Sequence, residues 1–355
     1  MSNISAKETS STRAARSRVG FLGVGWIGRH RMQAIVDTDT VDVVAIADAS
    51  PEMAQEAAKL ASGAVLVSSL DEMLAAGVDG VVIATPSAMH AEQSIKVLDA
   101  GAAVFCQKPL GRTAAEVTSV VEAARRADRL LDVDLSYRFT EGMQEIRKLV
   151  QSEELGRLYA VDLVFHNAYG PDKDWFYDPL RAGGGCVMDL GVHLVDLALW
   201  ALDFPAVETV SGSLFAGGQP LADETKQVED YAVATIALKS GTVIRLTCSW
   251  RLHAGADAVI SATFYGTQGG AALRNVNGSF YDFTAERYRG TASDTLTAPP
   301  DAWGGRAAAD WARRLAQGEG FNPEAEKLVD VARVLDGIYG RAPEQIQQAP
   351  GRTAA

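Results

Sequence analysis

The stretch Val19-Gly20-Phe21-Leu22-Gly23-Val24-Gly25-Trp26-Ile27-Gly28 decides the fold of the first half of the chain. Residues 19–22 form an apolar strand that runs into a GxGxxG turn, and a helix over 28–36 follows. A second strand over 41–47 ends at Asp48, twenty residues after Gly28. This order is the fingerprint of a dinucleotide-binding unit. Gly23 makes the tight turn, Gly25 lets the backbone approach a pyrophosphate, and Gly28 allows close packing of helix on strand.

The same segment predicts which dinucleotide binds. Backbone N–H groups at the start of the helix, near Trp26 and Ile27, favour phosphate oxygens. Asp48 can accept hydrogen bonds from the ribose hydroxyls and would repel a 2′-phosphate, so we expect NAD rather than NADP. Ser50 or Arg29 offers an alternative place for a phosphate, which keeps NADP as the less favoured option.

Working outward, strands and helices alternate strictly up to about residue 135. The expected strands are 19–22, 41–47, 65–68, 80–84, 103–106 and 130–133, and the expected helices are 28–36, 51–61, 70–76, 87–100 and 113–127. The strands are nearly continuous apolar runs, which is typical of parallel strands buried on both faces by crossover helices. The first half therefore predicts an α/β domain with a doubly wound parallel sheet, a Rossmann fold.

After Tyr137 the pattern changes. We expect helices over 140–152, 187–202, 306–317 and 323–339, and strands near 159–166, 207–216, 228–238, 242–250, 257–266 and 270–275. Short polar turns between most of these strands leave no room for crossover helices, so the sheet is expected to be open and largely antiparallel. The predicted organisation is a disordered tail (1–17), a Rossmann domain (18–138), an α+β domain (139–345) and a second tail (346–355). The last helices are free to pack back on the first domain.

Composition excludes several classes of protein. The 355 residues carry a formal net charge of −12, which disfavours nucleic acid and anionic membrane surfaces as partners. Cys106, Cys186 and Cys248 include no CxxC pair, so we expect buried thiols and neither a disulfide framework nor a metal site. No apolar run reaches about 18 residues, so no membrane span is expected. The first seventeen residues lack the apolar core of a secretion signal, which predicts a cytoplasmic protein.

Two further strand ends carry polar groups. Thr85-Pro86-Ser87 follows the strand over 80–84, with Ser87 as the expected helix cap and His90 one turn later. Gln107-Lys108-Pro109 follows the strand over 103–106, and Pro109 keeps Lys108 extended. Ligands of open α/β sheets bind outside the carboxyl ends of the strands, so both segments are expected at the cofactor. His90 is expected to buttress the cofactor loop rather than react.

The densest set of polar groups in an apolar setting is Gly183-Gly184-Gly185-Cys186-Val187-Met188-Asp189-Leu190-Gly191-Val192-His193-Leu194-Val195-Asp196. The three glycines let the backbone pass close to a bulky group. Asp189 and His193 stand four residues apart on an apolar helix, with Asp196 on nearly the same stripe. We expect Asp189 to orient His193, which accepts a hydroxyl proton while hydride leaves carbon. A satisfied structural Asp–His pair is the alternative interpretation.

The chain resembles the Gfo/Idh/MocA family, which includes glucose–fructose oxidoreductase and inositol 2-dehydrogenase, from Val19 to about Arg341. The motifs that carry the resemblance are GVGWIG, Asp48, ATPSAMH, the QKP element, YRF at 137–139 and GGGCVMDLGVHLVDL. It implies that Lys108, Asp189 and His193 form the catalytic group. It also implies cofactor contacts at Gly23, Gly25, Trp26, Ile27, Gly28, Asp48, Thr85, Pro86, Ser87, His90, Gln107, Lys108 and Arg138. The family usually has Glu where this chain has Gln107.

The predicted function is NAD-dependent hydride transfer between a nicotinamide and a carbinol carbon of a sugar, glycoside or cyclitol. The predicted substrate contacts are Lys108, Arg138, Tyr169, Trp175, Asp189 and His193. Aromatic and charged residues over 167–182 suit a polyol, with an oligomer interface as the alternative. His166, Arg251 and His253 lie near strand ends, where pocket and surface positions are equally expected. The alternative functions are a redox-assisted glycosidase or lyase and a non-catalytic NAD-binding regulator. A homodimer or homotetramer through the second sheet is expected.

Overall fold

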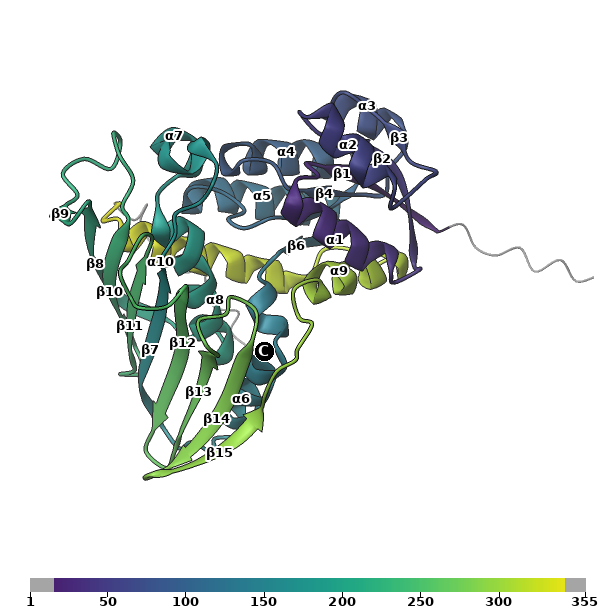
Figure 1. Ribbon diagram of the computed structural model, residues 1–355. Helices are drawn as coiled ribbons and strands as arrows, with labels where there is room; N and C mark the ends of the chain where they lie inside the picture. Colours follow the sequence, from purple (N-terminus) through teal and green to yellow (C-terminus); the bar gives the residue numbers. More distant parts are fainter. Residues whose placement is uncertain (1–15, 342–355) are drawn as a thin grey trace, which may run out of the picture.

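The computed structural model describes residues 16–341 and divides them into two packed units (Figure 1). The first contains a six-stranded parallel sheet in the order β3-β2-β1-β4-β5-β6, which is the strand order of a Rossmann fold. Its strands are β1 (Ser17–Leu22), β2 (Val41–Ala47), β3 (Val65–Leu66), β4 (Gly80–Ile83), β5 (Ala103–Cys106) and β6 (Leu131–Val133). The order reverses between β1 and β4, so the carboxyl ends of these two strands form the switch point where a ligand binds.

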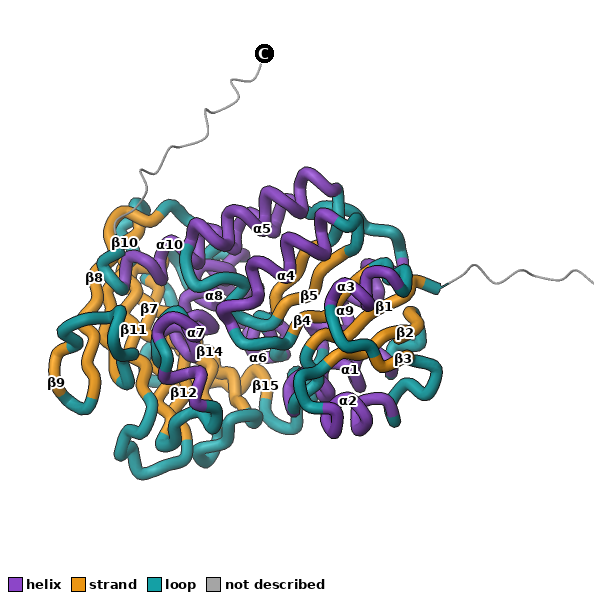
Figure 2. The backbone as a smooth tube through the Cα atoms, turned by 90° about the horizontal axis from the view of Figure 1, so that it is seen from above, coloured by secondary structure: helices purple, strands orange, loops and turns teal. Residues whose placement is uncertain are grey.

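Helices cover both faces of this sheet: α4 and α5 lie on one face, and α1 and α2 lie on the other (Figure 2). The helices are α1 (Trp26–Val36), α2 (Pro51–Ala58), α3 (Leu70–Ala75), α4 (Ser87–Asp99) and α5 (Ala114–Ala127). Ser50, Ser69 and Thr113 cap α2, α3 and α5 through their hydroxyl oxygens. The expected cap at Ser87 is wrong by one residue, because Pro86 occupies the cap position and Ser87 begins the helix.

The second unit is built on a nine-stranded sheet in the order β15-β14-β13-β12-β7-β11-β10-β8-β9. Its strands are β7 (Leu158–Asn167), β8 (Val207–Ala216), β9 (Gln219–Pro220), β10 (Tyr231–Leu238), β11 (Val243–Ser249), β12 (Ala258–Gly266), β13 (Gly270–Asn275), β14 (Phe283–Arg289) and β15 (Ala292–Thr297). β7 and β11 pair in parallel, and the other neighbours pair antiparallel. The predicted fold class, a Rossmann domain followed by an open and largely antiparallel sheet, is confirmed.

One face of the large sheet packs on helices, and α9 and α10 return to the first unit. The remaining helical elements are η1 (Ser136–Phe139), α6 (Glu141–Gln151), η2 (Asp174–Tyr177), α7 (Pro179–Ala182), η3 (Val187–Gly191), α8 (Val192–Ala201), α9 (Arg306–Ala316), η4 (Pro323–Glu326) and α10 (Lys327–Ile338). Buried side chains of α8 and α10 join the core of the large sheet. Trp311 of α9 is fully buried in the Rossmann core against Phe105.

Several sequence predictions need correction. β14 and β15 were not expected, because few of their side chains are buried and their sequences show little apolar alternation. The expected helix over 187–202 begins with a π-turn, η3, before α8. The predicted first tail is too long: Ser17 belongs to β1, and Arg16 forms an ion pair with Asp39 at 2.7 Å. The rest of that tail, 1–15, and the tail 346–355 lie outside the described residues.

One helical stretch among residues 16–341, Pro179–Ala201, is apolar enough by length and composition to cross a membrane, with a mean hydropathy of 1.3. The sequence reading did not detect it, because scattered polar residues interrupt the apolar run. In the structure 89% of this window is buried inside the protein, as is typical of the core helix of a large domain. The three cysteines are all free and buried, as predicted.

Candidate active site

A cleft of about 1160 Å³ lies where the carboxyl ends of the Rossmann strands face the start of α8. Its walls come from both units: the turn after β1, the segments after β4 and β5, η1, the glycine-rich segment before η3, and the loop over 301–305. The volume is somewhat above the range of about 300–1,000 Å³ for a single small-molecule pocket. The cleft therefore has room for a dinucleotide together with a small substrate.

The turn after β1 fits a dinucleotide as the sequence predicts. A Cβ on Gly23 would lie 2.5 Å from the carbonyl oxygen of Ala84, and one on Gly28 would lie 2.3 Å from that of Gly23. Side chains are excluded at both positions because the backbones of β1, α1 and β4 pack directly together. A Cβ on Gly25, in contrast, would meet no atom within 4 Å, so that backbone is open to the cleft.

The N-terminus of α1 is suited to hold a pyrophosphate. Among the described residues no side chain caps this helix, so the first N–H groups, near Trp26 and Ile27, are available to an anion. Asp48 lines the cleft and accepts hydrogen bonds from the backbone N–H of Val24 at 2.6 Å and of Ser50 at 2.9 Å. These bonds fix the carboxylate, and its remaining lone pairs can accept from ribose hydroxyls.

Lys108 and Asp189 come from different units and meet in the cleft. The Lys108 Nζ donates to Asp189 Oδ1 at 2.7 Å and to the Asp189 carbonyl oxygen at 2.8 Å. Trp250 Nε1 donates to Asp189 Oδ2 at 3.0 Å. Both side chains of the ion pair are largely buried, with 19% and 16% exposed. The pair is therefore held by direct contacts from the end of β5, the π-turn and the end of β11.

The predicted contact between Asp189 and His193 is wrong. None of the hydrogen bonds among residues 16–341 joins the two side chains, because Asp189 is bound by Lys108 and Trp250 instead. The reason is the π-turn over Val187–Gly191, which alters the regular four-residue spacing of an α-helix. π-turns are frequent at functional sites, and this one directs the Asp189 carbonyl toward Lys108.

His193 lines the cleft beside this ion pair. Its ring centroid lies 4.9 Å from that of Tyr137, and its Nδ1 is buried with no hydrogen-bond partner in the described part of the chain. Burial, and after it the positive charges of Lys108 and Arg31, lower the pKa of His193 well below the usual 6.5. The imidazole is therefore neutral at physiological pH.

Two residues predicted to contact ligands do not line the cleft. Arg138 does not line the cleft: its guanidinium donates to the buried carboxylate of Asp196, at 2.7 Å from Nε, and packs on Trp200. Tyr169 is 56% exposed outside the cleft, where its hydroxyl donates to Asp257 at 2.6 Å. Trp175 does line the cleft, with its ring stacked on that of Phe176 at 3.8 Å between centroids. The spacing of Tyr169 and Trp175 along the loop over 167–182 could not predict which of the two side chains enters the cleft.

The segments after β4 and β5 both reach the cleft, as predicted, and His90 ties them together. Thr85, Pro86, Ser87, His90, Gln107 and Lys108 all line it. The ring nitrogens of buried His90 lie 2.7 Å from the carbonyl oxygen of Pro109 and 2.6 Å from that of Thr85. Burial lowers the pKa of His90, against the opposing effect of these two carbonyls. His90 thus supports the loops structurally, in agreement with its expected buttressing role.

A buried polar cluster at the cleft was missed by the sequence analysis. Asp134 Oδ2 accepts from Arg31 Nε at 2.5 Å and from Gln107 Nε2 at 2.7 Å, and Asp134 Oδ1 accepts from the Ser136 hydroxyl. A carboxylate at position 107 would face Asp134, so glutamine suits this place in the chain. Asp134 follows directly after β6, and the rule for strand ends was sufficient to find it. No sequence signal marks Arg31, which lies inside α1.

His166, Arg251 and His253 lie outside the cleft. His166 stacks on Tyr231, and Arg251 and His253 line a separate pocket of about 510 Å³ beyond Trp250. Among residues 16–341 no group of three or more His, Cys, Asp or Glu side chains is arranged to hold a metal ion.

Comparisons with known proteins agree with this geometry. Residues 17–135 match the model of the oxidoreductase family with an NAD-binding Rossmann fold, and residues 143–272 match the GFO/IDH/MocA C-terminal domain. The chain is 31% identical over 260 residues to inositol 2-dehydrogenase of Acidiphilium cryptum (strain JF-5), which covers 72% of this chain and 73% of that protein. It is 28% identical over 268 residues to D-glucoside 3-dehydrogenase of Escherichia coli (strain K12), covering 72% and 76% of the two chains.

Among solved structures, GenD2 from gentamicin A biosynthesis, in complex with NAD, aligns with a TM-score of 0.77 at 25% identity, over 93% of this chain and 95% of that chain. Both units of the fold are included in this alignment. Together with the two family models and the inositol 2-dehydrogenase relative, these findings establish that the chain belongs to the Gfo/Idh/MocA family of oxidoreductases, with an NAD(P)-binding Rossmann domain.

Proposed function

We propose that this protein is an NAD-dependent dehydrogenase of a sugar, glycoside or cyclitol, and that Lys108, Asp189 and His193 form its catalytic group. The observation that carries the proposal is the 2.7 Å contact between Lys108 and Asp189, which joins the two units inside the cleft next to His193. An ammonium at the carboxyl end of a Rossmann strand, and a carboxylate and a neutral imidazole facing it across the cleft, are groups suited to alcohol oxidation.

Each group has a distinct role in the proposed reaction. Bound NAD would supply the hydride acceptor for oxidation of the carbinol carbon. His193 takes the hydroxyl proton, because its low pKa keeps the imidazole unprotonated before the reaction. Lys108 donates a hydrogen bond to the same oxygen and stabilises the negative charge that develops on it. Asp189, held by Trp250, fixes the position of the ammonium group.

The choice of NAD over NADP rests on Asp48. Its carboxylate is fixed at the cleft by two backbone N–H groups and would repel a 2′-phosphate. Arg29 and Ser50 also line the cleft, and they are the groups that would have to receive a 2′-phosphate if NADP bound. The proposed cofactor contacts are otherwise those predicted above, without Arg138.

The proposed substrate class rests on the aromatic residues of the cleft. Trp175 and Phe176 come from η2, Tyr281 comes from the loop between β13 and β14, and Trp303 comes from the loop after β15. Ring faces pack against the C–H faces of a sugar, while nearby polar groups such as Asp172 and Lys173 bind hydroxyls. The names of the relatives, an inositol dehydrogenase and a glucoside dehydrogenase, support a cyclic polyol.

A panel of free sugars, glycosides and inositols, assayed with NAD and NADP in parallel, tests this proposal. We expect growth of the absorbance of reduced nicotinamide with at least one cyclic polyol, and faster with NAD than with NADP. Conversion of a glycoside without net cofactor reduction would instead identify a redox-assisted glycosidase or lyase. Tight NAD binding with no turnover of any compound would identify a regulator.

The pH dependence is a further prediction. Since burial and two positive charges lower the pKa of His193, the unprotonated base persists to lower pH than in an ordinary histidine. We therefore expect kcat/KM to stay constant as the pH falls toward 6.5 and to drop only below that value. A pH profile of kcat/KM checks this, and an inflection at or above 6.5 would contradict the role of His193 as the base.

We also propose a homodimer or homotetramer formed through the uncovered face of the large sheet, in the cytoplasm. Val233, Val243 and Val259, on β10, β11 and β12, are partly exposed large hydrophobic residues, which supports an interface there. The three free cysteines support a reducing compartment. Light scattering of the intact protein would determine the assembly.

A further inference from the structure

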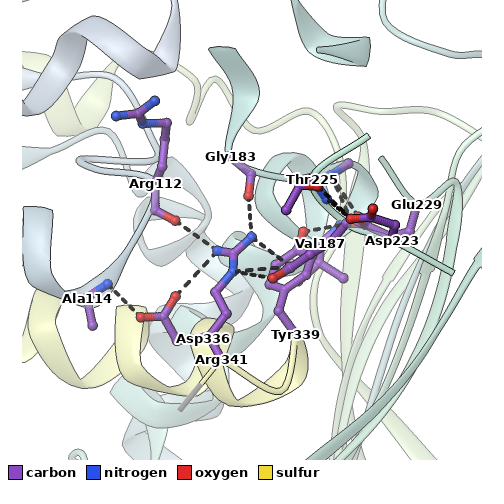
Figure 3. A network of polar contacts seen from close by, with 12 residues as sticks. Arg112, Ala114, Gly183, Val187, Asp223, Thr225, Glu229, Asp336, Tyr339 and Arg341 are labelled. Carbon is purple, nitrogen blue, oxygen red and sulfur yellow. Dashed lines mark hydrogen bonds and ion pairs between the residues drawn. The ribbon is translucent and has the colours of Figure 1, made fainter. Parts of the chain in front are cut away.

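A buried carboxylate lies directly beneath the glycine-rich segment of the cleft (Figure 3). Glu229 is fully buried, and its carboxylate accepts hydrogen bonds from the backbone N–H of Gly185 at 2.9 Å and of Val187 at 2.8 Å, and from the Tyr339 hydroxyl at 2.8 Å. Burial raises the pKa of Tyr339 well above its usual value, so the hydroxyl keeps its proton and remains a donor. Glu229 therefore caps the start of the segment that carries Asp189 and His193.

Gly184 and Gly185 of this segment pack directly against Tyr339 and Glu229. A Cβ on Gly184 would lie 2.0 Å from the Tyr339 hydroxyl oxygen, and one on Gly185 would lie 1.9 Å from the Glu229 carbonyl oxygen. Both glycines also line the cleft. The backbone of this segment is therefore a single layer between the site and the network, and a shift of Tyr339 or Glu229 is transmitted to it directly.

Arg341 extends the network to the Rossmann unit (Figure 3). Its Nη2 donates to the Gly183 carbonyl oxygen at 2.8 Å, and its Nη1 donates to the Arg112 carbonyl oxygen at 3.1 Å. Its guanidinium lies 4.1 Å from the centre of the Tyr339 ring. Asp336 accepts from the Ala114 backbone N–H at 2.8 Å. Asp336 and Arg341 thus join the loop that begins at Lys108 to the segment that leads to Asp189.

We propose that Glu229, Tyr339 and Arg341 form a positioning network, here called the C-terminal clamp, that holds the backbone before Asp189 and His193 in register with the loop after Lys108. The inference rests on the proposed function for its catalytic consequence. The clamp touches neither substrate nor cofactor, so it acts through the geometry of the catalytic group. A misplacement of about 1 Å at such a group costs about 10²-fold in rate.

Tyr339→Phe and Arg341→Met test the clamp, with Tyr288→Phe and Arg333→Met as matched controls. Tyr288 also donates to a carboxylate, that of Glu286 on β14, and Arg333 forms an exposed ion pair with Asp330 on α10. We expect each clamp variant to lower kcat about tenfold or more with unchanged NAD affinity. We also expect the acid limb of kcat/KM to move toward 6.5, because a looser segment admits water to His193.

Hydrogen–deuterium exchange of the same proteins gives a readout that needs no substrate. Peptides over 183–193 should exchange faster in both clamp variants than in the wild type or the controls, while peptides of β1 and α1 stay unchanged. Unchanged exchange over 183–193 in Tyr339→Phe would overturn the clamp, as would faster exchange spread uniformly over the protein. Absence of turnover in the wild type would contradict the proposed function, and the exchange result would still decide the clamp.

Discussion

Lys108→Met is expected to lower kcat by about 10²- to 10⁴-fold, the range for loss of a group that assists proton movement and stabilises charge at the reacting oxygen. The ammonium of Lys108 is held at 2.7 Å from the Asp189 carboxylate inside the cleft. Methionine has a similar length and no charge, so it removes the hydrogen bond without opening a large cavity. Steady-state assays with the best polyol of the panel would measure kcat, and titration of NAD would measure the affinity for the cofactor.

The control for this variant is Lys96→Met on α4, where the lysine side chain is 45% exposed and pairs with Asp71. Its kcat should match that of the wild type within experimental error, since Lys96 does not line the cleft and an exposed ion pair contributes little to folding stability. NAD affinity should remain in the Lys108 variant, because the pyrophosphate and ribose are held by the α1 turn and Asp48. Retention of more than about a tenth of the wild-type kcat would contradict a catalytic role for Lys108.

His193→Asn is expected to produce a loss of similar size, about 10²- to 10⁴-fold in kcat. Asparagine keeps a polar group in the cleft beside Tyr137 but accepts no proton near neutral pH. The residual activity should therefore lose the acid limb of the wild-type pH profile, which Lys108→Met should retain. This difference in pH profile distinguishes His193, the proposed proton acceptor, from Lys108, which binds the reacting oxygen and stabilises its negative charge.

His253→Asn provides the matched control, because His253 is exposed and lines the second pocket outside the cleft. It should keep both the rate and the pH profile of the wild type. If His193→Asn retained the acid limb, another group would have to be the base, and the proposed assignment would fail. Thermal unfolding of both variants would verify that any loss of rate is not a loss of folded protein.

Local chemistry was sufficient to predict the Rossmann unit. Gly23 and Gly28 are required by backbone contacts that exclude a Cβ, and Thr113 caps a helix through its own hydroxyl. The contact of Gly28 with Gly23 and the Thr113 cap act within a few residues of the chain, so they leave direct signals in the sequence. The atom that a Cβ on Gly23 would meet belongs to distant Ala84, but the glycine itself is part of the recognisable motif. The last two strands, β14 and β15, left weak signals, since few of their side chains are buried.

Proximity of Lys108, Asp189 and His193 came from the family resemblance, and the pairing derived from helical spacing was wrong. Four-residue spacing predicted contact between Asp189 and His193, but the π-turn redirects Asp189 to Lys108 and Trp250. Arg138 likewise pairs with Asp196 and does not line the cleft. In each case the partner lies at least 58 residues away along the chain.

The sequence by itself determined the two-unit fold, the dinucleotide turn and the strand ends that carry reactive groups. Only the tertiary structure decided which buried charge pairs with which, where Arg31 and Asp134 meet, and how Glu229, Tyr339 and Arg341 support the site. The physical reason is that secondary structure and capping depend on neighbours within a few residues. A buried charge instead pairs with whichever complementary group the packed chain brings within about 3 Å of it.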